Sequence, residues 1–359
     1  MHDLLDTNSV VVLGAGATKA FLEHAPLAID NYNLKGLLAN FRGFPHAYEL
    51  LELERARRSD GLINIEPLMT RLQGRMPYDT VEAIPQLVHL LSELKREFVR
   101  RIRFARKGAF HKEELAAVAR TYVKKGVTCI TFNYDDVLDQ ALWEVESQYR
   151  VGYSGKQYWH PDGGYGFFVR PSEVMVQDVN RQMDTTSMSL FKLHGSINWF
   201  PRKGETPPYN LNAICHDQNW YPPISEVLPA PERELVVRHL EPDPFLIPPV
   251  LDKSTLANEP VLQVVWSQAK DALSSVRQIY FVGYSMPVTD LAASFLFSES
   301  VGDRVQLIRV INWATHEEDK VQIRAAYRGV FPKLKDEQFS FDGALKWAKE
   351  VSASSDSTR

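Results

Sequence analysis

Residues 9 to 17 read SVVVLGAGA, an apolar run of strand length that ends in a glycine-rich tip. Four later segments repeat this arrangement. Strands made of near-continuous Val, Ile, Leu and Phe are typical of parallel sheets that helices cover on both faces. We therefore predict an α/β fold with a parallel sheet flanked by helices. The four segments are VTCITFNYD (127 to 135), SLFKLHGS (189 to 196), QIYFVGYS (278 to 285) and VQLIRVIN (305 to 312).

The polar ends of these segments predict where a ligand binds. Open parallel sheets bind ligands beyond the carboxyl ends of their strands, so all five tips are expected to face one crevice. Asn133 and Asp135 end the second segment, and His194 ends the third. An imidazole can act as a base near neutral pH, and an amide can orient a water molecule or a ribose hydroxyl without adding charge.

The segments between the strands predict a second, helical part of the chain. Three stretches carry apolar residues at helical spacing: IEPLMTRLQG, VEAIPQLVHLLSELKREFVRRIRFARK and HKEELAAVARTYVKKG, the last stopped by Gly126. We expect a main domain of residues 1 to 40 and 113 to 345, with loop insertions at 150 to 186 and 200 to 246. Residues 41 to 112 are expected to form a helical insertion. The small polar residues of 352 to 359 predict a disordered tail.

Composition excludes several classes of protein. The 359 residues are 44% hydrophobic and carry a net charge of −4, which gives no basic field for nucleic acid. No apolar stretch is long enough to cross a membrane, and the N-terminus is acidic where a signal peptide would be basic. We expect a cytoplasmic protein. Two cysteines, Cys129 and Cys215, cannot form a four-cysteine zinc module, so no metal is expected.

The glycine-rich tip suggests a phosphate cradle but leaves an alternative open. Gly14, Ala15, Gly16 and Thr18 follow a strand and open a predicted helix, where backbone N–H groups favour a pyrophosphate. The stretch is not a GxxxxGK[ST] loop, and Lys19 replaces the third glycine of GxGxxG. A tight turn that binds no ligand would use the same residues.

The other tips also have structural interpretations. Asp135 or Asp136 suits the N-cap of the next helix, and Asp290 suits another cap or a ligand contact. A single His is more often structural than catalytic. Ser285 fits a turn, and Asn312 can simply close a strand.

Taken in order, GAGAT, T-x-N-x-D, H-G, G-Y-S and I-N resemble the sirtuin superfamily, and KLHGS and GYSMPVTD resemble its bacterial sirtuin-like branch. The resemblance implies a Rossmann-like fold that binds NAD⁺ as substrate. It also implies roles for single residues. Gly14, Ala15, Gly16 and Thr18 match the diphosphate loop, Asn133 and Asp135 the residues near the nicotinamide ribose, and His194 the catalytic base. Gly283, Ser285 and Asp290 lie in the motif that lines the dinucleotide, and Asn312 matches a residue near the adenosine ribose.

The same resemblance implies an activity. Many members of the bacterial branch are NAD⁺-consuming effectors of antiphage defence, some beside a HerA-type ATPase or another sensor. We expect an NAD⁺ hydrolase (NADase) that releases nicotinamide, with Asn133, His194 and Asp135 as catalytic residues, and a homo-oligomer. The acyl-peptide features of deacylating sirtuins are not recognisable, and Phe132 replaces a glutamine common before the catalytic Asn.

Three alternatives remain open at this stage. A sensor would bind NAD⁺ or ADP-ribose without cleaving it. A protein deacylase or ADP-ribosyltransferase would need an acylated or acceptor protein. A structural subunit would bind no NAD⁺.

Overall fold

The computed structural model describes residues 5–58, 60–74, 76–105, 111–149, 159–167, 170–171, 188–216, 243–248, 258–287 and 290–356. Contacts divide the chain into two compact units. The first consists of residues 1–21, 110–246 and 256–359, and the second of residues 22–109 and 247–255.

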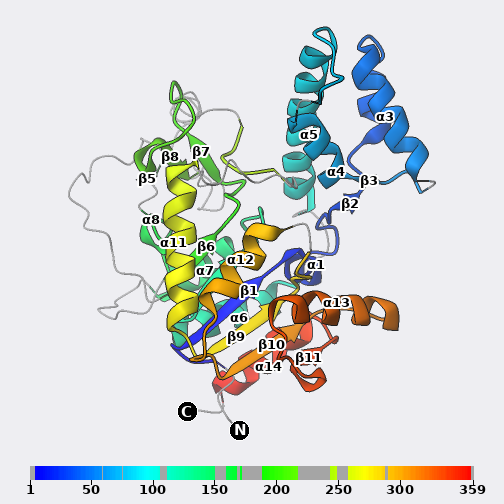
Figure 1. Ribbon diagram of the computed structural model, residues 1–359. Coiled ribbons are helices and arrows are strands. Elements are labelled where there is room, and N and C mark those ends of the chain that lie inside the picture. The colour runs from blue at the N-terminus through cyan, green and yellow to red at the C-terminus, as the bar shows by residue number, and fades with distance from the viewer. Residues whose placement is uncertain are drawn as a thin grey trace. The chain divides into compact units, whose positions relative to one another are not determined.

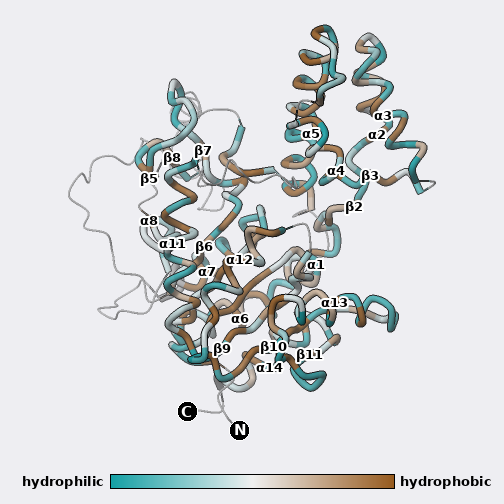
Figure 2. The backbone as a smooth tube through the Cα atoms, viewed as in Figure 1, coloured by the Kyte–Doolittle hydropathy of each residue, from teal (hydrophilic) through white to brown (hydrophobic). Residues whose placement is uncertain are grey.

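A six-stranded parallel sheet forms the centre of the first unit (Figure 1). All five predicted strands belong to it, and their buried side chains explain the apolar runs. β1 is buried along its whole length. Hydrophobic colouring follows the central strands in Figure 2. The strands are β1 (Ser9–Leu13), β4 (Thr128–Thr131), β6 (Leu190–Lys192), β9 (Gln278–Val282), β10 (Leu307–Ile311) and β11 (Phe339–Ser340).

The order of the strands defines the type of sheet. Across the sheet they run β11-β10-β9-β1-β4-β6, and every pair is parallel. Numbered by their sequence within this sheet, they give the order 3-2-1-4-5-6 of doubly wound dinucleotide-binding folds. The chain changes direction across the sheet between β1 and β9, which is where such folds bind ligands. The predicted Rossmann-like α/β fold is thereby confirmed.

Helices cover both faces of the sheet, as two neighbouring residues of β9 illustrate. The ring of Tyr280 packs on Trp347 of α14, whereas Phe281 packs on Phe297 of α12 and Tyr327 of α13. Successive strand residues point to opposite faces, so these helices lie on opposite faces. The helices of this unit are α1 (Ala15–Phe21), α6 (Lys112–Lys125), α7 (Val137–Tyr149), α8 (Pro161–Gly164), α11 (Pro260–Ser275), α12 (Leu291–Ser300), α13 (Glu317–Val330) and α14 (Ala344–Asp356).

Gly126 ends α6 as predicted. Its φ of 63° is in the left-handed region, and its N–H donates to the carbonyls of Tyr122 and Val123 at the end of the helix. Glycine adopts this conformation without strain, which turns the chain directly into β4.

A small second sheet lies beside these elements in the first unit. Its order is β5-β8-β7, and β7 and β8 pair antiparallel. Parts of the predicted loop insertions, residues 150–158, 168–169, 172–186 and 217–242, lie outside the described residues. The strands are β5 (Arg170–Pro171), β7 (Trp199–Pro201) and β8 (Ile214–His216), and short helices are η2 (Leu211–Ala213) and η4 (Asp336–Gln338).

The second unit is mainly helical. In α5, Leu87, Leu90, Leu94 and Phe98 are buried at helical spacing, so one stripe faces the unit's interior. Two of the three predicted helical stretches, α4 and α5, belong here, and the third is α6. The predicted limits of an insertion, residues 41 to 112, stay a prediction because compactness alone does not define a domain. The elements are β2 (Ile29–Asp30), α2 (Leu34–Asn40), α3 (Pro45–Arg57), β3 (Ile63–Asn64), α4 (Ile65–Gln73) and α5 (Ala83–Ala105).

The end of the chain differs from the prediction. α14 continues to Asp356, so residues 352 to 356 are helical where a disordered tail was expected. Val351 is fully buried and anchors the last turns. Among the described residues, no helix combines the length and the apolar composition needed to cross a membrane.

Candidate functional site

The tips of β1 and β9 touch backbone to backbone where the sheet changes direction. Gly16 N–H donates to the Gly283 carbonyl at 2.9 Å, and Gly14 N–H donates to the Val282 carbonyl at 3.1 Å. A Cβ on Gly14 would lie 2.5 Å from Tyr284 Cα, and a Cβ on Gly283 would lie 2.0 Å from Ala17 N. The fold itself therefore requires glycine at positions 14 and 283. This close contact agrees with the interpretation of the glycine-rich tip as a tight turn.

A chain of hydrogen bonds joins the tips of β1 and β4. Asn133 Nδ2 donates to the Gly14 carbonyl and to Thr18 Oγ1, each at 2.9 Å. Thr18 Oγ1 in turn donates to Asp135 Oδ2 at 2.7 Å. Thr18 thus links the amide to the carboxylate, and the three residues form what we call the Thr18 network.

Asp135 also serves the helix that follows it. Its Oδ1 accepts a hydrogen bond from Val137 N–H at 3.1 Å, at the start of α7. The two oxygens of one carboxylate therefore reach α1 and α7. The helix-capping interpretation of Asp135 and its place beside Asn133 are compatible, because each uses a different oxygen.

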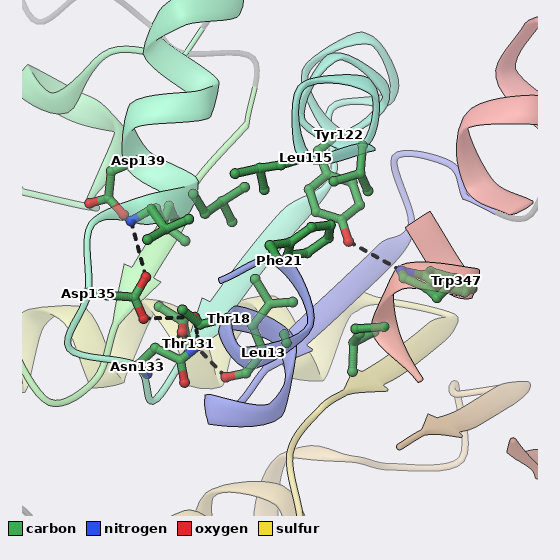
Figure 3. Close-up of a pocket in the computed structure, with 17 residues that line it drawn as sticks. Leu13, Thr18, Phe21, Leu115, Tyr122, Thr131, Asn133, Asp135, Asp139 and Trp347 are labelled. Atoms are coloured by element: carbon green, nitrogen blue, oxygen red, sulfur yellow. Dashed lines mark hydrogen bonds between the residues drawn. The ribbon is translucent and has the colours of Figure 1, made fainter. Parts of the chain in front are cut away.

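The Thr18 network lies at one end of a pocket in the first unit (Figure 3). The pocket and the open solvent at its mouth together contain about 550 Å³ of space that no atom occupies. Apart from the network, its walls are mostly apolar and come from β1, α1, α6, α7 and α14. Tyr122 and Trp347 form the far wall, where Trp347 Nε1 donates to Tyr122 Oη at 3.3 Å. Hydroxyl, amide and carboxylate groups beside an apolar wall suit a polar ligand with a flat or apolar part.

A buried ion pair supports the loop that carries Asn133 and Asp135. Lys192 is fully buried, and its Nζ lies 3.1 Å from Asp139 Oδ2 and donates to the Asp135 carbonyl. Tyr165 Oη donates to Asp139, and Asn198 Nδ2 donates to Tyr165 Oη. Burial raises the pKa of the Asp139 carboxyl above its usual value, and the nearby Lys192 ammonium offsets part of this rise. Both charges have partners, as buried charges require.

His194 lies in an aromatic environment at the tip of β6. Its ring is 5.3 Å from that of Phe132 and 5.8 Å from that of Tyr134, centroid to centroid. Its Nε2 is 3.8 Å from Asp290 Oδ2, and both side chains are buried. Asp290 Oδ1 accepts from Ala293 N–H at 3.3 Å, so Asp290 is the N-cap of α12.

The remaining predicted residues lie at the tips of β9 and β10. Asn312 Nδ2 donates to the Tyr284 carbonyl at 2.8 Å, and Tyr327 Oη donates to the same carbonyl at 2.7 Å. Asn312 therefore holds the turn that follows β9. Ser285 and Ala15 are exposed, and Gly16 is half-buried.

The structure brings the predicted residues together in two groups. Asn133 and His194 each follow the paired residues Thr131 and Lys192 by two positions, so they end adjacent strands. Their side chains have different neighbours: Asn133 belongs to the Thr18 network, whereas His194 contacts Phe132, Tyr134 and Trp266. Thr18, Asn133 and Asp135 line the pocket of Figure 3, and His194 is not among the described residues that line it.

Several residues of this region were not singled out from sequence. Lys192 and Asp139, which form the supporting ion pair, are two of them. Phe132, noted from sequence only as a replacement for glutamine, stacks on Tyr284 with ring centroids 4.6 Å apart. One signal was available: a lysine within an otherwise apolar strand needs a buried partner. Within the described part of the chain, no group of three or more His, Cys, Asp or Glu side chains is placed to hold a metal ion.

Comparison with known proteins gives distant structural likenesses. No family model and no curated protein matches the sequence. A Sir2 enzyme structure from a study of mechanism and regulation matches with a TM-score of 0.39 and 11% identity, covering 98% of this chain and 93% of that chain. A Sir2 homologue in complex with NAD matches at 0.36 and 13%, covering 90% of each chain. A Sir2 complex with a p53 peptide and NAD⁺ matches at 0.36 and 12%, covering 98% of this chain and 94% of that one.

With TM-scores below 0.5, these likenesses carry no weight in assigning a function. The class of protein follows from the strand order and the site: the first unit is a doubly wound α/β unit with glycine-rich and polar strand tips at one edge of its sheet.

Proposed function

We propose that the protein is an NAD⁺ glycohydrolase of the sirtuin-like type, which cleaves the bond between nicotinamide and ribose. One observation carries the proposal. The strands that end in GAGAT, Asn133 with Asp135, His194, Gly283 and Asn312 occupy successive places in a sheet with the strand order of dinucleotide-binding folds. Their carboxyl ends therefore share one edge.

The groups at this edge fit a dinucleotide in their chemistry. The Thr18 network offers a hydroxyl, an amide and a carboxylate, which suit ribose hydroxyls and a carboxamide better than a bare anion. The glycine turn of residues 14 to 16 keeps side chains away from the backbone beside it. NAD⁺ would supply its own leaving group, a nicotinamide that departs neutral.

Hydrolysis of NAD⁺ changes two bonds at C1′ of the ribose. The C1′–N bond breaks and its electron pair goes to the nicotinamide nitrogen, through an oxocarbenium-like transition state. A water oxygen bonds to C1′, and His194 takes the proton from that water or from a ribose hydroxyl. General-base assistance of this kind contributes about 10²- to 10⁴-fold in rate. Asn133 would position the water or hydroxyl, and Asp135 would hold Asn133 through Thr18.

The decisive experiment measures nicotinamide release from NAD⁺ by the purified protein, with mass analysis of the sugar product. We expect His194→Ala and Asn133→Ala each to lose at least about 100-fold in rate. The control His24→Ala changes an exposed histidine and keeps full activity. Circular dichroism checks that all variants fold. Full turnover in both site variants would show that the assignment is wrong.

The same samples separate the alternatives. A sensor is favoured if NAD⁺ raises the melting temperature but no nicotinamide appears, because a ligand stabilises whatever state binds it. A deacylase or ADP-ribosyltransferase is favoured if turnover requires an acylated or acceptor protein. No thermal shift and no release favour a structural subunit.

The sequence resemblance supports a cellular role for this activity. We propose NAD⁺ depletion during antiphage defence, in a homo-oligomer and beside a HerA-type ATPase or another sensor. Expression of the wild-type chain with its neighbouring genes should lower cellular NAD⁺ during phage infection, whereas the His194→Ala chain should not. An equal NAD⁺ level in the two strains would refute this role.

A further inference from the structure

Asp290 has two carboxylate oxygens with different surroundings. Oδ1 accepts from Ala293 N–H and caps α12, whereas Oδ2 lies 3.8 Å from His194 Nε2. The side chains of Asp290 and His194 are 6% and 5% exposed. The cap uses one oxygen, and the other oxygen lies near the imidazole.

The surroundings of this pair strengthen its electrostatic interaction. Phe132 contacts the imidazole edge to face, and Trp266 of α11 lies 6.5 Å away, centroid to centroid. Aromatic walls lower the local dielectric constant and strengthen interactions between charges. The titratable groups packed against His194 include Asp290 from α12 and Tyr134 from the segment after β4. Of these two, Asp290 is the carboxylic acid, and its Oδ2 is the oxygen that lies near the imidazole.

We propose that Asp290 is a positioning residue that holds the imidazole of His194 through its Nε2 and stabilises the ring once it has accepted a proton. The inference rests on the proposed function, in which His194 is the base. The proton moves from the water or ribose hydroxyl to Nδ1 of His194, and Asp290 remains a carboxylate throughout. A helix cap at a strand-end motif thereby also sets the protonation state of the base.

Asp290→Asn separates the two roles, because asparagine caps helices about as well as aspartate but carries no charge. We expect its melting temperature to stay near that of the wild type. A nearby carboxylate favours protonated histidine, so its loss should move the acidic limb of the pH profile of kcat to lower pH by about 1 to 3 pH units. On the plateau, kcat should fall about tenfold or more, since the ring is a weaker and less oriented base.

An NMR titration of labelled histidine tests the pairing without relying on turnover. The His194 signal is assigned by its loss in His194→Gln. Its titration midpoint should move to lower pH in Asp290→Asn by about 1 to 3 pH units. The control Asp303→Asn removes an exposed carboxylate and should leave both midpoint and pH profile unchanged.

The outcomes distinguish the two ideas. An unchanged midpoint and an unchanged pH profile in Asp290→Asn would overturn the inference even if nicotinamide release continues. If the midpoint shifts in Asp290→Asn but the wild-type protein releases no nicotinamide, the pairing is upheld and the proposed function is rejected. Asp290→Glu, which keeps the charge, should recover the wild-type midpoint if charge is what matters.

Discussion

Thr18 has one hydroxyl and two partners within the site. It accepts from Asn133 Nδ2 at 2.9 Å and donates to Asp135 Oδ2 at 2.7 Å. The side chain of Thr18 is buried, whereas Asn133 and Asp135 are half-buried. Removing the hydroxyl takes one hydrogen bond from the amide and one from the carboxylate, and the bond to the carboxylate is the stronger because its acceptor is charged.

We therefore predict that Thr18→Val lowers the free energy of unfolding by about 1 to 3 kcal/mol. Thr18→Ser keeps the hydroxyl and should lose clearly less, so it is the matched control. Urea unfolding followed by tryptophan fluorescence measures both. Equal losses in the two variants would mean that the methyl group, and not the hydroxyl, matters at this position.

For single residues, the sequence predicted which side chains follow strands, but it did not predict their hydrogen-bond partners. Asn133, Asp135 and His194 were identified because they end apolar runs, and each does follow a strand of the sheet. Thr18 was assigned to a diphosphate loop, and its link between Asn133 and Asp135 could not be seen, because the partners are more than a hundred positions apart. Hydrogen bonds between distant tips depend on strand order, which no local pattern encodes.

The turn after β9 has no room for a side chain at Gly283. Gly283 has a φ of 63°, and an added Cβ would lie 2.0 Å from Ala17 N and 2.4 Å from Gly16 C. Both clashes are with backbone, which cannot rotate away. The helix α1 and the turn would have to separate to admit a methyl group.

Gly283→Ala should therefore lower the free energy of unfolding by about 2 to 6 kcal/mol, from backbone strain together with overpacking. Gly329→Ala is the contrasting variant, because nothing lies within 4 Å of its added Cβ and it sits inside α13. It should stabilise the protein by about 0.5 to 1 kcal/mol, since alanine favours helix. Thermal and urea unfolding of both variants check the contrast. A Gly283→Ala protein as stable as wild type would contradict the close contact.

Elements were predictable where burial dictates composition. The five strands were recognised because both of their faces are covered, which leaves few polar residues in them. β11 was missed because it has two residues at the edge of the sheet, too few for a pattern. The final turns of α14 were missed because small polar residues suggest disorder, whereas buried Val351 shows that packing decides.

At the scale of the whole molecule, the reactivity of the two buried cysteines can measure unfolding. Cys129 lies in β4 and Cys215 in β8, and both are buried. Burial raises the pKa of the Cys129 thiol, which keeps it out of the reactive thiolate form. Neither thiol should react with a water-soluble reagent while the first unit stays folded.

We predict that the native protein shows less than one reactive thiol per chain with an aromatic disulfide reagent, and two in urea. Modification should follow the urea unfolding curve. Cys129→Ala and Cys215→Ala tell the two thiols apart. Fast reaction of either one in native buffer would indicate local opening of its strand.

The overall strand order was the part of the fold that sequence could not supply. Apolar runs predict that strands exist, but which strands become neighbours depends on contacts between residues far apart in the chain. β1 pairs with β4 on one side and β9 on the other, and the composition of β1 is the same for any neighbours. The helical unit shows the same limit, because a helical pattern defines a buried stripe and not its partner.

The pairing of β1 with β9 has a consequence for synthesis on the ribosome. β1 emerges early, yet one of its two edges stays bare until residues 278 to 282 have been translated. The tips that carry Gly283 and Asn312 join those of β1, β4 and β6 only after that moment, so a nascent chain cannot complete this edge of the sheet before β9 has been made. For a protein whose proposed reaction would drain its own host's NAD⁺, late closure of the central sheet withholds activity until translation has passed β9.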